Sequence, residues 1–288
     1  MKVRATRELP GPAWSELGEI EIAPVGEPGP DIEALVVTNE AVDLDRYPSL
    51  RLIANYGVGY DRVDVAAAAA RGVAVTNTPG VLDAATADLA IALMLAVRRG
   101  VVASDRLVRS GRWGTHWSAA PVLGRDLAGA TLGIVGLGRI GSAVARRAAA
   151  FDMHVRHIRR GGDLDELLRH SDVVSLHVPL SAETRGLITR ERLARMQDGA
   201  TLVNTARGEI VDEDALVAEL VSGRISAGLD VFAHEPHVPP ELLELPNVVL
   251  TPHIGSGTVE TRAAMTRVVV ENVLALARDV PLPNAVAP

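Results

Sequence analysis

Short apolar runs rich in β-branched residues alternate with Ala- and Leu-rich segments of helical periodicity along most of the chain. This alternation is typical of βα units that build a parallel sheet. In the second half, the apolar runs predict six strands, at residues 131–135, 154–158, 172–176, 201–204, 226–229 and 248–250. Six such strands with intervening helices indicate a doubly wound parallel sheet of the Rossmann type, which binds dinucleotides.

The N-terminal part of the chain carries a smaller α/β series. It predicts strands at residues 34–37, 52–54 and 73–75 and an Ala-rich helix at residues 63–70. Further along, we expect a long helix at 84–99, an irregular connection at 111–125 and a helix at 259–277. These elements predict two domains, one made of residues 1–90 plus 263–288 and the other of residues 91–262.

Composition narrows the class of protein. A length of 288 residues suits two hydrophobic cores, and the net charge of -7 without a polybasic segment argues against a nucleic-acid partner. The absence of cysteine excludes disulfides, thiolate metal sites and cysteine nucleophiles, and it fits a reducing cytosol. The longest apolar stretch, residues 84–97, is shorter than the roughly 20 residues that a membrane span needs. We therefore expect a cytoplasmic protein that does not bind membranes.

A G-x-G-x-x-G sequence at residues 136–141 follows a predicted strand and opens a predicted helix. In this context the glycines allow a tight turn and a close approach of the backbone, and the helix N-terminus attracts a pyrophosphate. The alternative is a glycine-rich turn that serves only packing. The loop residues expected to contact a dinucleotide are Gly136, Leu137, Gly138, Arg139 and Ile140.

Three residues with useful chemistry follow the carboxyl ends of predicted strands, where open α/β sheets bind ligands: Arg207, Glu235 and His253. Arg207 could hold a substrate carboxylate through two parallel hydrogen bonds. His253 could transfer the proton that accompanies hydride transfer, and Glu235 could pair with His253 and keep it protonated. Taken singly, each of them is more often an ordinary surface residue.

A metal site is not expected. His234, Glu235 and His237 lie close together in the sequence, but Pro236 breaks any helix there and the spacing differs from H-E-x-x-H.

Several motifs along the chain carry a resemblance to a known family. In chain order they are residues 55–61, Thr78-Pro79-Gly80 with Thr86-Ala87-Asp88, residues 136–141, Asn204 to Gly208, Gly228 to Phe232 with Glu235-Pro236, and Pro252 to Gly255. On these motifs, the chain resembles the D-isomer-specific 2-hydroxyacid dehydrogenases over nearly its whole length. The resemblance implies a Rossmann cofactor domain at residues 91–262, a smaller flavodoxin-like substrate domain at residues 1–90 plus 263–288, and a cleft between them that binds a small 2-oxo or 2-hydroxy acid.

By resemblance, Arg207 binds the substrate carboxylate and carbonyl, His253 is the acid/base and Glu235 is its partner. Backbone N–H groups of Val58 and Gly59 would complete the carboxylate site. The family is usually dimeric, and the resemblance suggests that Trp117, with Trp113, contributes to the partner's substrate pocket; ordinary packing aromatics are the alternative. The further residues expected to contact the cofactor are Thr86, Val178, Pro179, Thr205, Ala206, Arg207, Asp230, His253 and Gly255.

Within the family, residues 252–262 resemble the glyoxylate, hydroxypyruvate and hydroxyphenylpyruvate reductases. Two alternatives stay open: a reductase of another 2-oxo acid, and a dinucleotide-sensing binding protein like the corepressors that share this fold.

The end of the second strand of the cofactor domain predicts which dinucleotide is bound. An NAD-binding domain usually has Asp or Glu there, about 20 residues past the glycine loop, but this chain has Arg159 and Arg160. Two guanidinium groups suit the 2′-phosphate of NADP(H), although NAD(H) is possible. Asp163 could also reach the ribose, but the sequence Asp163 to Glu166 reads better as the N-cap of the next helix.

Overall fold

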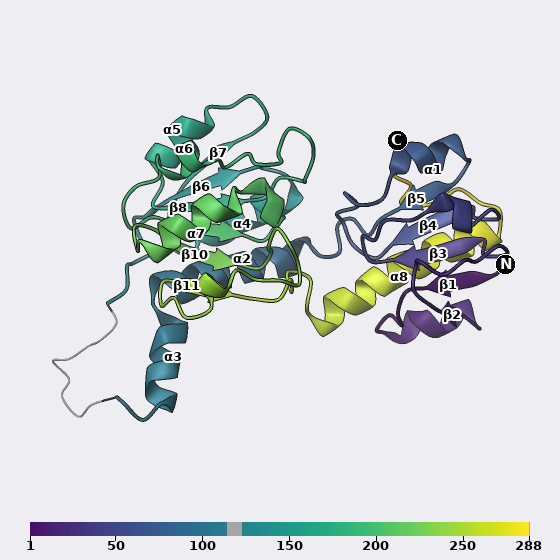
Figure 1. Ribbon diagram of the computed structural model, residues 1–288, viewed down its shortest axis with the longest axis horizontal. Helices are drawn as coiled ribbons and strands as arrows, with labels where there is room; N and C mark the ends of the chain where they lie inside the picture. The colour runs from purple at the N-terminus through teal and green to yellow at the C-terminus, as the bar shows by residue number, and fades with distance from the viewer. Residues whose placement is uncertain (114–122, 288) are drawn as a thin grey trace. The chain divides into compact units, whose positions relative to one another are not determined.

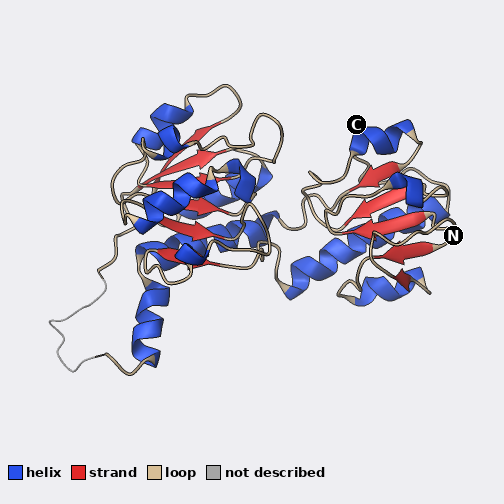
Figure 2. Ribbon diagram, in the orientation of Figure 1, coloured by secondary structure: helices blue, strands red, loops and turns tan. Residues whose placement is uncertain are grey.

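The computed structural model describes residues 1–113 and 123–287, and the chain divides into two compact units. The first unit contains Met1–Leu82 and Ser256–Pro288, and the second contains Asp83–Gly255. Each unit is built on one parallel β-sheet flanked by helices (Figure 2). Helix α2 (Asp83–Arg98) belongs wholly to the second unit and helix α8 (Val259–Ala277) wholly to the first, so the units divide a few residues before the boundaries expected from the sequence.

The sheet of the first unit has the strand order β2-β1-β3-β4-β5, and every pairing in it is parallel. This is the flavodoxin-like order, so the expected fold class of this unit is confirmed. Its three longer apolar runs are the predicted strands, whereas β1 and β2 were not predicted. The elements of this unit are β1 (Val3–Ala5), η1 (Pro12–Leu17), β2 (Glu21–Ile22), β3 (Ala34–Val37), η2 (Leu44–Arg46), β4 (Leu52–Asn55), α1 (Val65–Ala70), β5 (Ala74–Thr76) and α8 (Val259–Ala277).

Both α-helices of the first unit begin at side-chain caps. Asp64 accepts a hydrogen bond from the Ala67 N–H at 2.9 Å to begin α1, and Thr258 accepts one from the Thr261 N–H at 3.1 Å to begin α8. Helix α8 packs against β4 and buries Met265, Val269, Val270 and Val273. Each helix thereby covers apolar strand residues that a bare sheet would expose to water.

The sheet of the second unit has the order β11-β10-β9-β8-β6-β7, again parallel throughout. Its six strands are those predicted, within one residue at each end: β6 (Thr131–Val135), β7 (His154–Ile158), β8 (Val173–Leu176), β9 (Thr201–Asn204), β10 (Ser226–Leu229) and β11 (Val248–Leu250). The chain moves outward from β6 to β7 and then crosses back to β8 on the other side of β6. The strand order therefore reverses between β6 and β8, and a ligand crevice is expected at the carboxyl ends of these strands.

Helices cover both faces of this second sheet (Figure 1). Helices α2 and α4 pack on one face, and α5, α6 and α7 pack on the other. Helix α3 extends away from the sheet and buries none of its residues. The helices are α2 (Asp83–Arg98), α3 (Val101–Arg109), α4 (Arg139–Ala149), α5 (Leu164–Arg169), α6 (Arg190–Leu193) and α7 (Glu213–Val221), with short turns η3 (Gly208–Ile210) and η4 (Pro240–Leu242).

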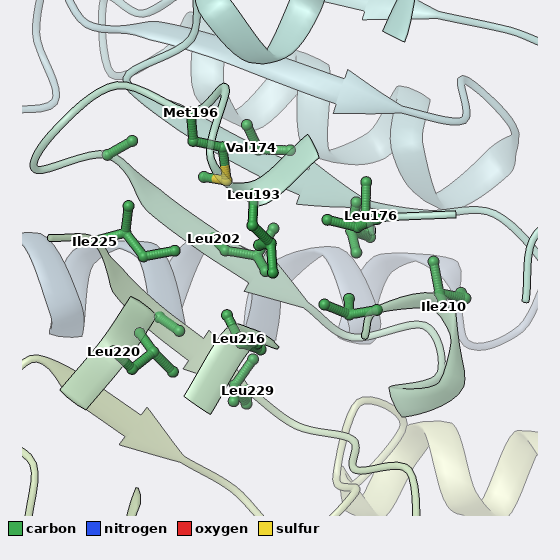
Figure 3. Packing of buried hydrophobic residues seen from close by; sticks show 14 of the residues in the cluster. Val174, Leu176, Leu193, Met196, Leu202, Ile210, Leu216, Leu220, Ile225 and Leu229 are labelled. Atoms are coloured by element: carbon green, nitrogen blue, oxygen red, sulfur yellow. The ribbon is translucent and has the colours of Figure 1, made fainter. Parts of the chain in front are cut away.

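The core under α6 and α7 is aliphatic (Figure 3). Leu193 and Met196, at α6 and just after it, meet strand residues such as Leu176 and Leu202, and Leu216 of α7 joins them; all five are buried. Packing of this kind fixes the strands and so fixes the loops that leave their carboxyl ends. Within residues 1–113 and 123–287, no helix is long and apolar enough to cross a bilayer.

Candidate active site

The three glycines of the loop after β6 meet different surroundings. Gly136 has φ +95°, and a Cβ there would lie 2.6 Å from the carbonyl oxygen of His177. A Cβ on Gly141 would lie 2.1 Å from the carbonyl oxygen of Gly136, so this glycine allows helix α4 to pack close to the loop. A Cβ on Gly138 would meet nothing within 4 Å. The loop therefore needs glycine at two positions for packing and leaves open space at the third, at the start of α4, where a pyrophosphate can bind.

The loop after β8 packs against this glycine loop. The Val178 side chain lies 2.7 Å from the Cβ position of Gly136, and Pro179 accepts a hydrogen bond from the Thr184 hydroxyl at 2.6 Å. The ring of His177 is hydrogen-bonded to the Ser175 hydroxyl, with 2.8 Å between Nε2 and Oγ. Burial lowers the pKa of His177 to about 4, so this ring is neutral at pH 7. Apolar and neutral groups thus line the expected adenine side.

At the end of β7, the two arginines differ in their partners. Arg160 forms an ion pair with Glu183, and its Nε donates to Glu183 Oε2 at 2.8 Å. Within the described part of the chain, the side chain of Arg159 has no hydrogen bond or ion pair. Asp163 caps α5 by accepting the Glu166 N–H at 2.9 Å, as the sequence predicted. Glu183 was not predicted to lie here, because it is distant in the sequence and belongs to the loop after β8.

Arg207 follows β9 in a turn that Asn204 organises. The buried Asn204 side chain donates to the Arg207 carbonyl at 2.8 Å and accepts the Ala206 N–H at 3.0 Å. The half-buried guanidinium of Arg207 donates to the Ala206 carbonyl at 2.7 Å. A Cβ on Gly208 would lie 2.0 Å from the backbone carbon of Phe232, so glycine is required for the turn to pack against the chain leaving β10. These positioning roles of Asn204 and Gly208 were not predicted from the sequence.

Asp230, at the end of β10, organises the loop that carries His253. Its carboxylate accepts hydrogen bonds from the Thr251 hydroxyl at 2.6 Å and from the N–H groups of Ile254 and Gly255, each at 2.8 Å. His253 has φ +53°, a conformation that a non-glycine residue adopts only when its surroundings hold it. Burial raises the pKa of Asp230, although these hydrogen bonds and His253 oppose the shift.

Glu235 and His253 are hydrogen-bonded, with 2.7 Å between Glu235 Oε2 and His253 Nδ1. The other oxygen, Oε1, accepts the Phe232 N–H at 3.1 Å. Partial burial alone would raise the pKa of Glu235, but the hydrogen bond and charge of His253, with the nearby Arg207, outweigh it and lower the pKa. Glu235 is therefore ionised at neutral pH, and its use of Nδ1 leaves Nε2 of the half-exposed imidazole for another partner.

The residues expected on the nicotinamide side come together beside this pair. The Cβ position of Gly255 lies 3.4 Å from both Asp230 Oδ2 and the Thr86 methyl group. Thr205 has a buried hydroxyl without a hydrogen-bond partner among the described residues. A buried hydroxyl of this kind is costly unless a ligand satisfies it. The polar groups, the open Gly138 position and the start of α4 together fit a nicotinamide dinucleotide.

In the first unit, Val58 and Gly59 lie in the loop after β4, and both are half-buried. The Val58 carbonyl accepts a hydrogen bond from the Asn77 side chain at 2.9 Å, and the Gly59 carbonyl accepts one from Asn55 at 2.9 Å. Among residues 1–113 and 123–287, nothing accepts a hydrogen bond from the N–H of Val58 or of Gly59. Trp117 lies outside the described residues, and Trp113 is 65% exposed.

Comparison with known proteins identifies the family. The model of the D-isomer specific 2-hydroxyacid dehydrogenase NAD binding domain matches residues 91–255. A glyoxylate reductase of Korarchaeum cryptofilum is 49% identical over 276 residues, covering 89% of this chain and 83% of that protein. The crystal structure of the TT0316 protein from Thermus thermophilus is 46% identical, with a TM-score of 0.91 and full coverage of both chains. An NADPH-dependent glyoxylate/hydroxypyruvate reductase from Sinorhizobium meliloti, in complex with NADP and malonate, is 37% identical, with a TM-score of 0.88 and coverage of 99% and 96%.

The chain belongs to the D-isomer-specific 2-hydroxyacid dehydrogenase family. It is an NAD(P)-dependent oxidoreductase, and the similarity to the glyoxylate reductase subgroup expected from residues 252–262 is confirmed. The second unit contains its nicotinamide dinucleotide-binding domain.

Proposed function

We propose that this protein reduces a small 2-oxo acid of the glyoxylate or hydroxypyruvate type to the D-2-hydroxy acid, with NADPH as the preferred reductant. The observation that carries the proposal is the hydrogen-bonded pair of Glu235 and His253 beside Arg207, at the carboxyl ends of adjacent strands. The names of the relatives, which include glyoxylate and hydroxypyruvate reductases, support the substrate class.

Each residue has a defined task in this proposal. Arg207 binds the substrate carboxylate and polarises the adjacent carbonyl, because a guanidinium offers two parallel donors in one plane. The N–H groups of Val58 and Gly59 bind the same carboxylate. Glu235 holds His253 through Nδ1, so that Nε2 faces the substrate and gives a proton to the carbonyl oxygen. The bound dinucleotide supplies the hydride that the carbonyl carbon accepts.

The dinucleotide would be held by the residues described above. The N-terminus of α4 and the loop Gly136 to Ile140 would bind the pyrophosphate, and Val178 and Pro179 would contact the adenine side. Thr86, Thr205, Asp230 and Gly255 would line the nicotinamide side. For the 2′-phosphate, Arg159 offers a guanidinium without a partner in the described chain, whereas Arg160 shares its charge with Glu183. The preference for NADPH therefore rests mainly on Arg159.

A direct assay tests the proposed reaction. Purified protein is mixed with NADPH and glyoxylate, and then with a panel of other 2-oxo acids, while the absorbance of the reduced cofactor is followed. We expect reduction of one or more small 2-oxo acids. Tight NADPH binding without reduction of any member of the panel would refute the proposal and favour a dinucleotide-sensing role.

We also propose that the protein is a homodimer that associates through its second units. Helix α3 buries none of its residues, and Val101 and Val108 on it are 53% and 55% exposed. Apolar side chains exposed along one helix mark an interaction surface. Sedimentation at micromolar concentration is expected to give a dimer, and a monomer would refute this assembly together with any role of Trp117 in a partner's pocket.

A further inference from the structure

In the loop that contains Val58 and Gly59, the carbonyl groups of residues 57–59 all accept hydrogen bonds from donors of the first unit. Asn55 Nδ2 donates to the carbonyls of Gly57 and Gly59 at 3.0 and 2.9 Å, and the Thr78 N–H also donates to Gly57. Asn77 Nδ2 donates to the Val58 carbonyl at 2.9 Å. A side-chain amide has two donor hydrogens, so Asn55 can satisfy both of its acceptors.

These hydrogen bonds set the direction of the two N–H groups. In a planar trans peptide, the C=O of one residue and the N–H of the next point in opposite directions. The peptide bonds of this loop are trans. Asn55 and Thr78 therefore orient the Val58 N–H by holding the Gly57 carbonyl, and Asn77 orients the Gly59 N–H by holding the Val58 carbonyl. Both N–H groups point away from the donors that hold the loop.

The C-terminal tail in turn holds Asn77. Asn77 directly follows β5, at one edge of the sheet, where Ala285 pairs with Thr76 in antiparallel fashion. The Val286 N–H donates to Val75 at 2.8 Å, and the Asn77 N–H donates to the Asn284 carbonyl at 3.4 Å. The tail thus forms an isolated antiparallel bridge at the edge of the sheet, beside the residue that orients the Gly59 N–H.

A buried asparagine on α8 fixes the tail. Asn272, which is fully buried, donates through Nδ2 to Asn284 Oδ1 at 3.0 Å and accepts the Asn284 N–H at 3.1 Å. Nδ2 also donates to the Val268 carbonyl at 2.7 Å. This reciprocal contact connects α8 to the tail, and the tail connects to Asn77. The whole series lies within the first unit.

We propose that Asn77 is a positioning residue for the substrate carboxylate, and that residues 284–286 of the C-terminal tail keep it in place. The inference rests on the proposed function, in which the Val58 and Gly59 N–H groups bind that carboxylate. Loss of Asn77 frees the Val58 carbonyl to rotate, and the Gly59 N–H then no longer meets the substrate. The tail therefore supports the substrate site through Asn77, and it also covers the edge of the sheet.

The test compares Asn77→Ala, Asn284→Ala and the double variant in the full-length protein. For Asn77→Ala we expect a KM for the 2-oxo acid about tenfold higher, the fold-change for loss of one hydrogen bond to a charged group. For Asn284→Ala we expect a rise of about threefold, because the Asn77 side chain is intact and only its support is weakened. The Kd for NADPH, measured by fluorescence, and kcat are expected to stay within about twofold in both variants.

The double variant separates positioning from general stability. If the tail acts through Asn77, the double variant has the same KM as Asn77→Ala, whereas independent effects multiply. Thr266→Val is the matched control, because it removes a buried hydrogen bond from α8 to Pro10 at 2.6 Å without touching β5 or the tail. It is expected to lower Tm and leave KM unchanged.

The outcomes are distinct. An unchanged KM in Asn77→Ala, or multiplied effects in the double variant, would overturn the proposal. If Asn77→Ala does not fold, Asn284→Ala decides alone: a lowered Tm with an unchanged KM would also overturn it. A parent protein that reduces no 2-oxo acid would instead refute the proposed function, so the two failures are separable.

Discussion

In the second unit, the loops that follow β6 and β8 are held in place differently from the loops that follow β9, β10 and β11. After β6 and β8, the loops depend on backbone geometry, with Gly136 at positive φ against Val178 and a neutral His177. After β9, β10 and β11, the loops depend on polar side chains: buried Asn204 and Asp230 hold the turns that present charged groups. Backbone groups of a loop and a helix N-terminus can bind the pyrophosphate of a dinucleotide. Proton transfer instead needs individual side chains at fixed positions.

His253→Asn is expected to have the largest effect. The substitution removes the proton donor, so kcat should fall by about 10²- to 10⁴-fold, the range of general acid catalysis, while the Kd for NADPH changes little. Steady-state kinetics and cofactor fluorescence measure the two quantities. His237→Asn, an exposed histidine of the neighbouring loop, is the control and should behave as the parent. Retention of kcat would place proton transfer elsewhere.

Arg207→Lys is expected to lower kcat/KM about 100-fold while NADPH binding survives. An ammonium group keeps the charge but cannot offer two parallel hydrogen bonds to a carboxylate, and a lost bond to a charged group costs roughly 1.5–3 kcal/mol. Arg185→Lys is the matched control, because Arg185 is an exposed arginine whose Nη1 lies 3.9 Å from Oε1 of Glu209, a residue of the turn η3. Near-normal kcat/KM in the Arg207 variant would exclude the carboxylate role.

His177 is expected to make the stability of the second unit depend on pH. Its pKa is lowered from 6.5 to about 4 in the folded protein, so the unfolded chain binds more protons between these values. This contribution to stability is present above pH 6.5 and is lost as the pH falls towards 4, by up to about 3 kcal/mol. Urea unfolding at pH 7 and pH 4.5 should show a smaller loss for His177→Gln than for the parent. An exposed control, His170→Gln, should lose as much as the parent.

Exchanging the charges at the end of β7 tests the arginine side chains proposed to bind the 2′-phosphate of NADPH. For Arg159→Asp with Arg160→Ala, we expect kcat/KM with NADPH to fall at least about tenfold, while NADH is affected less. Assays of both proteins with both cofactors measure the change. A parent that prefers NADH, or a variant with an unchanged preference, would show that these arginines are only surface charges.

Glu235→Gln is expected to have the smallest effect at neutral pH. The hydrogen bond and charge of His253 lower the pKa of Glu235, and glutamine keeps a hydrogen-bond acceptor but loses the charge. Reduction needs a proton donor, so the part of the pH–rate profile in which activity falls with rising pH should move to lower pH. A pH–rate profile measures the shift, and an unmoved profile would remove Glu235 from its assigned role.

Much of this fold could be predicted because most of the predicted strands are apolar runs that are buried on both sides, with the edge strand β7 as the exception. The strands at 34–37 and 131–135 are examples, since almost every residue in them is buried. The missed elements lack that signal. Strand β1 contains Arg4, and both residues of β2 are exposed. Helix α3 buries no residue, and its apolar side chains are partly buried or exposed.

Some residues of the candidate site could likewise be predicted from the sequence, and others could not. Arg207, Glu235 and His253 could be found because each follows the end of a strand in a recognisable motif. Other contacts of the site could not be found, because they join groups far apart in the sequence. Arg160 with Glu183, and Asn77 with Val58, are pairs that only the folded chain brings together. Asn204 and Asp230 stand inside motifs, but their hydrogen bonds to the following turns depend on loop conformation.

The composition of the first unit from two separate stretches of chain has a consequence for biosynthesis. Its sheet is made by residue 82, but helix α8 and the tail that complete it follow only after the 173 residues of Asp83–Gly255. At a synthesis rate of roughly 5–20 residues per second, the second unit is made in about 10 to 35 seconds. During that time the strand face that α8 will cover has no partner from its own unit, and the nascent chain is open to aggregation or to chaperones.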